Sequence, residues 1–193
     1  MIRTYLLGIA LALSVPIAAS ADRWAVVPDA SSFGFISVKE GDIAEVHSFG
    51  RLTGAIDEGK AEVMIDLASV ETHIDIRNER MREILFNIAE TPMITVTAAI
   101  DVDGFSDLSI GSRRTLEIDF TIDTGAVSSD YFAEVNVTRV GPDAVSVASA
   151  QPIPVDASEF GYAEGIEKLR EIAGLDSISI IVPVSFDLML NRQ

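Results

Sequence analysis

Apolar and polar residues alternate along most of the chain after its N-terminal segment. In the clearest stretch, Leu116, Ile118, Phe120 and Ile122 are separated by charged or hydroxyl-bearing residues. Because successive side chains of a strand point to opposite faces, this pattern predicts a strand with one buried and one wet face.

The same alternation closes the chain over residues 178–190, where one face carries only apolar side chains. A strand of this length exceeds the usual length of about five or six residues and suits a barrel. Pro183 has no backbone N–H to donate, so we expect a bulge or an unpaired stretch at that position.

Seven further segments have the composition of strands, and glycine-containing turn signals separate several of them. They cover residues 23–27, 32–38, 45–56, 61–67, 93–102, 129–140 and 144–148. No repeat, low-complexity tract or linker interrupts the series. The sequence therefore predicts one all-β domain, either a sandwich or a barrel.

Two segments show helical spacing instead. In residues 76–88, Met81, Ile84, Leu85 and Ile88 fall on one helical face, and in residues 162–173 a similar stripe ends just before Gly174. Both segments predict short helices at a barrel end or wall. Whether such helices only plug the core or also gate a pocket stays open.

The first 21 residues have the features of an export signal. Arg3 supplies a positive charge, an apolar run covers residues 6–19, and Ala19-Ser20-Ala21 matches a cleavage site. The run is short for a membrane span, and the chain has no cysteine for acylation or disulfides. We expect residues 1–21 to be a signal peptide, residues 22–193 to be one domain, and the protein to be periplasmic or secreted.

Acidic residues outnumber basic ones by 30 to 14, which gives a formal net charge of −16 at pH 7. Such a surface repels phosphate-rich partners and anionic lipid surfaces. We therefore expect no nucleic-acid partner and no stable membrane insertion, and we interpret the acidity as a source of solubility.

Candidate catalytic residues are few. His47 precedes Ser48, but neighbours on a strand point to opposite faces, so His47 is poorly placed to activate Ser48. Glu71, His73 and Asp75 would share a strand face and could bind a divalent ion, although a polar strand edge is the favoured interpretation. No phosphate loop, G-x-S-x-G or H-E-x-x-H motif is present. The sequence favours a protein that is not an enzyme and holds no metal.

Arginines are dense between Arg77 and Arg82, in a chain with only 14 Lys and Arg residues. One interpretation is a solvated helix face with local ion pairs, such as Glu79 with Arg82. The other is that an arginine reaches backbone carbonyls at a barrel mouth or a polar ligand head. We favour the first.

Phenylalanines are spread over the predicted strands, at positions 33, 35, 49, 120, 132 and 186. A small barrel fills its interior with side chains, whereas a slightly larger one holds a ligand. Periodicity alone does not distinguish a filled core from a lined cavity.

Several motifs resemble those of one known family. Near the start they are Trp24, Asp29-Ala30-Ser31-Ser32-Phe33-Gly34-Phe35 and Phe49-Gly50-Arg51-Leu52-Thr53-Gly54. The most specific are Ser69-Val70-Glu71-Thr72, Arg77-Asn78-Glu79-Arg80-Met81-Arg82-Glu83, Leu85-Phe86 and Pro92-Met93-Ile94-Thr95-Val96, and Glu159-Phe160-Gly161 precedes the last strand. Together they resemble the YceI-like family, exported lipocalin-like barrels that bind polyisoprenoid or other long amphiphilic molecules.

The resemblance implies an antiparallel, lipocalin-like β-barrel of about eight strands with two short helices. It implies that the lumen takes a hydrophobic ligand, the isoprenoid tail of a quinone or polyprenol, and no cofactor beyond such a bound lipid. The alternative is a non-catalytic structural or protein-interaction barrel with a packed core. A homodimer also stays open.

Strand alternation then selects the side chains that would line such a lumen. The expected ligand-binding residues are Phe33, Phe35, Phe49, Leu116, Ile118, Phe120, Val182, Val184 and Phe186.

Overall fold

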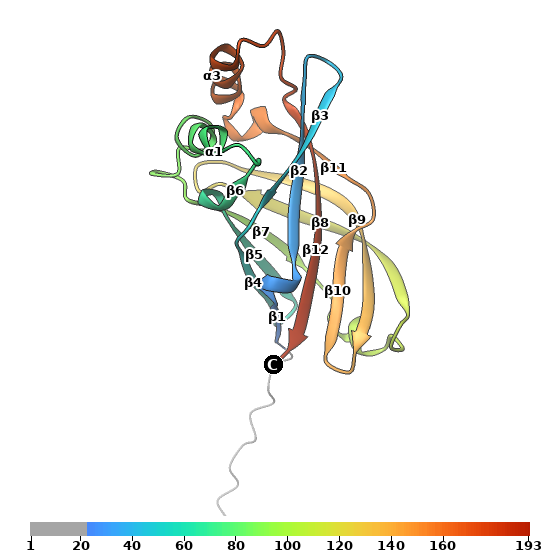
Figure 1. The fold of residues 1–193 in the computed structure, drawn as a ribbon. Helices are drawn as coiled ribbons and strands as arrows, with labels where there is room; N and C mark the ends of the chain where they lie inside the picture. Colours follow the sequence, from blue (N-terminus) through green and yellow to red (C-terminus); the bar gives the residue numbers. More distant parts are fainter. Residues whose placement is uncertain (1–22) are drawn as a thin grey trace, which may run out of the picture.

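The computed structural model describes residues 23–193. The expected signal peptide, residues 1–21, lies outside this part of the chain. Within it, strands form a curved wall, and the helices of residues 75–80 and 163–173 lie at one end of it (Figure 1).

Eight antiparallel strands form a closed ring. In spatial order they are β1 (Trp24–Val26), β4 (Leu52–Asp57), β5 (Lys60–Asp66), β7 (Met93–Ala99), β8 (Arg113–Asp123), β9 (Ser128–Gly141), β10 (Ala144–Ser149) and β12 (Ile181–Arg192). The ring closes where β1 pairs with β12, with Trp24 opposite Arg192 and Val26 opposite Leu190. The predicted all-β antiparallel barrel is therefore confirmed.

Further strands extend the wall beyond the ring. They are β2 (Ser32–Lys39), β3 (Ile43–Phe49), β6 (Val70–Glu71) and β11 (Ile153–Asp156). The upper half of β12 pairs with β2 on one side and with β11 on the other. The β2–β3 hairpin therefore rises past the ring toward the helices (Figure 1).

The strand expected over residues 45–56 is wrong as a single element, because it breaks at Gly50 and Arg51. The Gly50 N–H donates to the Ser69 carbonyl oxygen at 3.0 Å, and the Arg51 N–H donates to Ser69 Oγ at 3.0 Å. This break lets β3 pair with β2 while β4 pairs with β1 and β5.

The bulge or unpaired stretch expected at Pro183 is present on one side of β12 only. On that side, pairing with β2 ends at Val184, opposite Phe35, and the next bridge joins Ile178 to Lys39 with the register shifted by two residues. Pro183 lies directly opposite Pro154 of β11. Neither proline has an N–H, so the two residues that cannot donate share one position of the ladder.

Both predicted helices are present, but the first is irregular. It consists of α1 (Asp75–Arg80) followed by a π-helical turn, Met81–Leu85, so a continuous α-helix over residues 76–88 was wrong. The second is α3 (Ala163–Ala173), which ends at Gly174 in the left-handed conformation with φ 66°, as expected. A short α2 (Asp103–Ser106) was not predicted.

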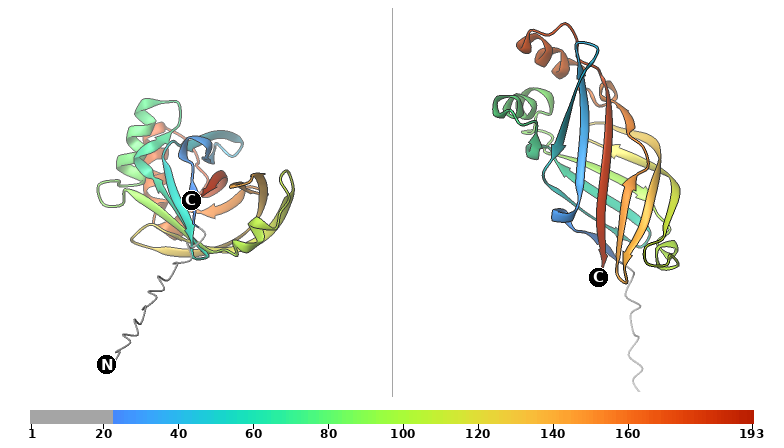
Figure 2. Two further views of the ribbon diagram at one scale, coloured as in Figure 1. Left: turned by 90° about the horizontal axis from the view of Figure 1, so that it is seen from below. Right: turned by 45° about the vertical axis from the view of Figure 1, so that its right-hand side comes forward.

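Helix α3 packs on the π-helical turn, and both lie at the same end of the barrel (Figure 2). Gly165 makes this contact close, since a Cβ at this position would lie 2.9 Å from the Ile84 carbonyl oxygen. None of the described helices is both long and apolar enough to cross a membrane.

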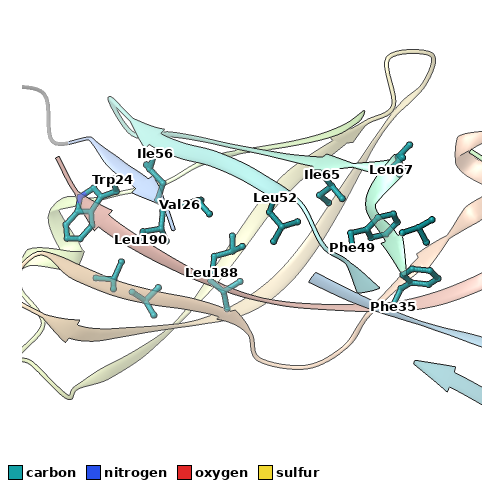
Figure 3. Packing of buried hydrophobic residues seen from close by; sticks show 14 of the residues in the cluster. Trp24, Val26, Phe35, Phe49, Leu52, Ile56, Ile65, Leu67, Leu188 and Leu190 are labelled. Atoms are coloured by element: carbon teal, nitrogen blue, oxygen red, sulfur yellow. The ribbon is translucent and has the colours of Figure 1, made fainter. Parts of the chain in front are cut away.

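The opposite end is closed by packed side chains. Trp24 and Phe105, which are 1% and 2% exposed, meet edge to face with their ring centroids 5.7 Å apart. From there, buried side chains follow the barrel interior past Leu52 to Phe49 and Phe35 (Figure 3).

Gly54 provides a test of the pairing between β4 and β5. A Cβ at Gly54 would lie 2.4 Å from the Glu62 carbonyl oxygen, which belongs to the backbone of the neighbouring strand. Gly54→Ala should therefore lower the free energy of unfolding by about 1–3 kcal/mol, measured by urea denaturation. Thr53→Ala, at the exposed neighbouring position, is the control and should change it by about 0.5 kcal/mol or less. A Gly54→Ala protein as stable as wild type would contradict the packing.

Candidate functional site

The barrel encloses a cavity of about 560 Å³ that is lined almost entirely by apolar side chains. This volume lies within the range of pockets that hold small organic ligands. All of the residues expected from the sequence lie on its wall, namely Phe33, Phe35, Phe49, Leu116, Ile118, Phe120, Val182, Val184 and Phe186. Their role in binding a ligand stays a prediction.

Strand alternation explains why the wall is apolar. On β8, Leu116, Ile118 and Phe120 face the cavity, while Glu117 and Asp119 between them are exposed on the outside. Leu116 and Ile118 are only half-buried although they lie inside a closed barrel. Their partial exposure is exposure to the cavity, so the interior is a lined lumen and not a filled core.

The two ends of the cavity differ. The end near Trp24 and Phe105 is packed, as described above. Among the described lining residues, only Ile74, Ile76 and Ala173 are exposed, and they lie beside or on the two helices at the other end. The cavity therefore opens at the end where its exposed lining residues lie. Figure 1 shows α1, α3 and the tip of the β2–β3 hairpin at this end.

Sequence reasoning missed the part of the lining that the helical end contributes. Phe86 and Tyr162 meet edge to face with centroids 5.6 Å apart, and Phe86 also contacts Phe49 at 5.8 Å. Met81 and Leu85 line the cavity as well. The helical stripe that contains Met81 and Leu85 was visible in the sequence, but its partner surface was not.

Polarity rises along the β2–β3 hairpin toward the open end. In register, Phe33 lies opposite Phe49, and Phe35 lies opposite His47. The next inward-facing pair brings Ser37 opposite Glu45, and all of these residues line the cavity. The deep wall is therefore apolar, and the mouth carries polar groups.

Ion pairs hold the mouth together. Glu45 accepts from Lys39 Nζ and from Arg77 Nη1, at 2.9 Å in each case. The hydrogen bond from Lys39 and the nearby charge of Arg77 lower the pKa of the Glu45 carboxyl, so it remains ionised at neutral pH. Arg77 also donates from Nη2 to the Thr72 carbonyl oxygen at 2.7 Å, which ties α1 to the chain before it.

A buried asparagine fixes the start of α1. Asn78 Oδ1 accepts hydrogen bonds from the Thr72 N–H at 2.8 Å and from Thr72 Oγ1 at 2.6 Å. Both residues are buried, so these bonds are shielded from water. The bonds therefore hold residues 72–74 against the first turn of α1 and fix the position of Arg77, which is next to Asn78.

His47 lies in this mouth at 3% exposure, with Nε2 2.8 Å from Ser37 Oγ. Burial lowers the pKa of His47, and the charge of Arg77 lowers it further. Ser48 is exposed on the other face of β3, so the two residues form no catalytic pair, as the alternation predicted.

The metal interpretation of Glu71, His73 and Asp75 finds no support in the geometry. Among residues 23–193, no three His, Asp or Glu side chains are grouped so that they could hold an ion. The carboxylate of Glu71 instead accepts from the His73 N–H and from Asn78 Nδ2.

The favoured interpretation of these arginines, a solvated helix face with local ion pairs such as Glu79 with Arg82, is wrong for Arg82. The other interpretation, an arginine that reaches backbone carbonyls, describes its contacts. Arg82 donates to the carbonyl oxygens of Ala68 and Val70, at 2.8 and 3.3 Å. Arg80 lines the cavity and makes no ion pair with the described residues.

An eight-stranded antiparallel barrel around an apolar cavity is the architecture of the small β-barrels whose lumen has room for one small ligand. The YceI-like domain matches residues 24–190, and the chain therefore belongs to the YceI-like family.

Solved structures of similar fold agree with this assignment. A polyisoprenoid-binding domain from Saccharophagus degradans, implicated in plant cell wall breakdown, is 34% identical with a TM-score of 0.86, over 88% of this chain and 98% of that one. BcnA of Burkholderia cenocepacia is 15% identical with a TM-score of 0.64, over 85% of this chain and 98% of that one, and this shows the fold alone. No curated protein matches the chain.

The buried His47 predicts a dependence of stability on pH. Its pKa is lower in the folded protein than its ordinary value of about 6.5, so the unfolded chain takes up this proton more readily. The free energy of unfolding should therefore fall as the pH drops through that ordinary value. His47→Gln removes this titration. Between about pH 7.5 and 5.5, the free energy of unfolding, measured by urea denaturation, should therefore fall less in the variant than in wild type. An equal fall in the free energy of unfolding in both proteins would contradict a lowered pKa of His47 in the folded state.

Proposed function

We propose that the protein is an exported, non-catalytic carrier that holds a polyisoprenoid or similar long amphiphilic lipid, such as a quinone or a polyprenol, in its barrel lumen. The observation that carries this proposal is the cavity of about 560 Å³, apolar along its wall, closed at one end and open at the other. A single apolar chain fits such a space better than a compact polar molecule does.

Burial of the lipid tail would supply the binding free energy. Each Å² of apolar surface removed from water contributes about 25 cal/mol, and the deep wall offers apolar contacts on every side. It carries few polar groups that would select one tail over another. Such a lumen favours tails of similar width and does not distinguish their fine chemistry.

The absence of catalysis is supported by the position of the titratable groups. Among the described lining residues, these groups are Lys39, Glu45, His47, Arg77, Arg80 and Tyr162. All six come from the β2–β3 hairpin, α1 and the start of α3, and the ion pairs and hydrogen bonds described above hold four of them. We propose that they act on the entrance of a ligand and not on a reaction.

The isoprenoid nature of the ligand is supported by the 34% identical relative, which is described as polyisoprenoid-binding. Export to the periplasm or the medium is supported by the signal motif in residues 1–21. The lined lumen favours a carrier over the alternative, a packed barrel that acts as a structural or interaction module. The absence of a nucleic-acid partner stays a prediction, and a homodimer stays open.

A larger side chain inside the lumen should weaken lipid binding. Ile118 faces the cavity from the middle of β8, so the larger indole of Ile118→Trp would occupy space that the lipid tail needs. The affinity for geranylgeraniol, measured by equilibrium dialysis, should fall about tenfold or more. Glu117→Trp places the same side chain on the outer face and should bind like wild type.

Thermal unfolding of both variants establishes that each is folded. A folded Ile118→Trp protein that binds geranylgeraniol as well as wild type would show that the lumen is not the binding site. Loss of binding in Glu117→Trp alone would place the site on the outer surface of the barrel.

A further inference from the structure

One side chain forms the floor of the lumen. Among the described lining residues, only Phe105 comes from residues 101–112, which belong to the connection between β7 and β8. Phe105 lies on α2 and packs edge to face on Trp24, which does not line the cavity. The closed end of the cavity is therefore set by this connection and not by the strands of the wall.

Burial along β12 shows where the free space ends. Five inward-facing residues of this strand line the cavity, and the three nearer the open end are half-buried, namely Val182, Val184 and Phe186. Leu188 and Leu190 are only 9% and 2% exposed. Leu190 lies opposite Val26, at the end of the barrel where Trp24 lies (Figure 3). The lumen therefore ends at the level of these last two leucines.

Hydrogen bonds from Arg139 hold the floor in place. Its Nη1 donates to the carbonyl oxygens of Phe105 and Leu108, at 3.5 and 3.3 Å. Its Nη2 donates to the Pro142 carbonyl oxygen at 2.6 Å, and its own carbonyl oxygen accepts from the Gly111 N–H at 2.7 Å. These bonds tie α2 to the turn between β9 and β10. A floor tied to the wall in this way is a fixed stop.

A fixed stop converts the length of a tail into a difference in affinity. Each CH2 group that moves from water into an apolar environment tightens binding about three- to fourfold. This gain ends when the tail meets the floor, because any further units stay outside the mouth, in water. A lumen with a floor therefore sorts single-chain molecules by length, although its wall is uniformly apolar.

The strand geometry sets the scale of this limit. Leu190 and Val182 are eight residues apart on β12, which corresponds to about 26 Å along the strand. With the strands of a small barrel tilted by about 40°, this is about 20 Å along the barrel axis. In extended form, farnesol is shorter than this span, and geranylfarnesol is longer.

We propose that Phe105 determines the longest tail that the lumen buries, so that the cargo is selected by length as well as by apolar character. This inference rests on the proposed carrier function, because the tail must occupy the lumen. Phe105 suits the role because it lines the closed end from a connection. Its replacement changes the depth of the lumen and leaves the strands of the wall as they are.

Substitutions of Phe105 should move the floor in opposite directions. The smaller side chain of Phe105→Leu deepens the lumen, and the larger one of Phe105→Trp makes it shallower. Thermal unfolding establishes which variants are folded. Because the two changes act in opposite directions, either folded variant is sufficient for the test.

The probes are farnesol and geranylfarnesol, which differ only in the number of isoprene units. The mature protein is incubated with an equimolar mixture of both, and the bound alcohols are quantified by mass spectrometry after gel filtration. Differences in solubility cancel, because wild type and variants meet the same mixture. Relative to wild type, the bound ratio of geranylfarnesol to farnesol should rise about threefold or more in Phe105→Leu and should fall in Phe105→Trp.

Ile118→Ala is the matched control, because it removes as many carbon atoms as Phe105→Leu does, but from the wall of the same lumen. Both tails extend past this position in the middle of β8. Their affinities should therefore change by the same factor, and the bound ratio should stay as in wild type.

The outcomes separate this proposal from the carrier function. If both probes bind and the ratio is the same in wild type and in the folded Phe105 variants, the floor does not select length and the carrier stands. If Ile118→Ala shifts the ratio as much as Phe105→Leu does, total volume sets the preference, which also overturns the proposal. If neither probe binds to wild type, the carrier function itself is wrong.

Discussion

Pairing of β1 with β12 is the interaction on which the rest of the molecule depends. It closes the sheet on itself, with Trp24 opposite Arg192, so that no strand of the ring keeps an unpaired edge. Backbone hydrogen bonds around the ring then hold the wall around the lumen, and packed side chains close it at the end near Trp24 and Phe105. The closed wall encloses an apolar lumen of about 560 Å³.

The lumen is built along one axis, and its chemistry changes along that axis. Trp24 and Phe105 pack against each other at one end, while at the other the β2–β3 hairpin carries Ser37, Glu45 and His47 in register above its phenylalanines. This order is that of an amphiphile, with an apolar tail and a polar head. The irregular helix α1 and its π-helical turn lie where the lumen opens, which places the least regular element beside the entrance.

The wall could be predicted from the sequence because strand alternation is local. Leu116, Ile118 and Phe120 reveal their shared face within a few residues, and the structure places them on the cavity. The mouth could not be predicted, because it depends on contacts between distant segments: Arg77 reaches Glu45 across 32 positions. The break at Gly50 was missed for the same reason, since its partner, Ser69, lies on another segment.

The central claim is that the lumen holds one long apolar chain, and native mass spectrometry of the protein purified from its own cells tests it most directly. We predict a complex with one lipid per barrel that organic extraction releases as a prenyl lipid or a similar single-chain amphiphile. A protein of unmodified mass that takes up neither added polyprenol nor quinone would contradict the account. It would favour a barrel that serves as a structural or interaction module.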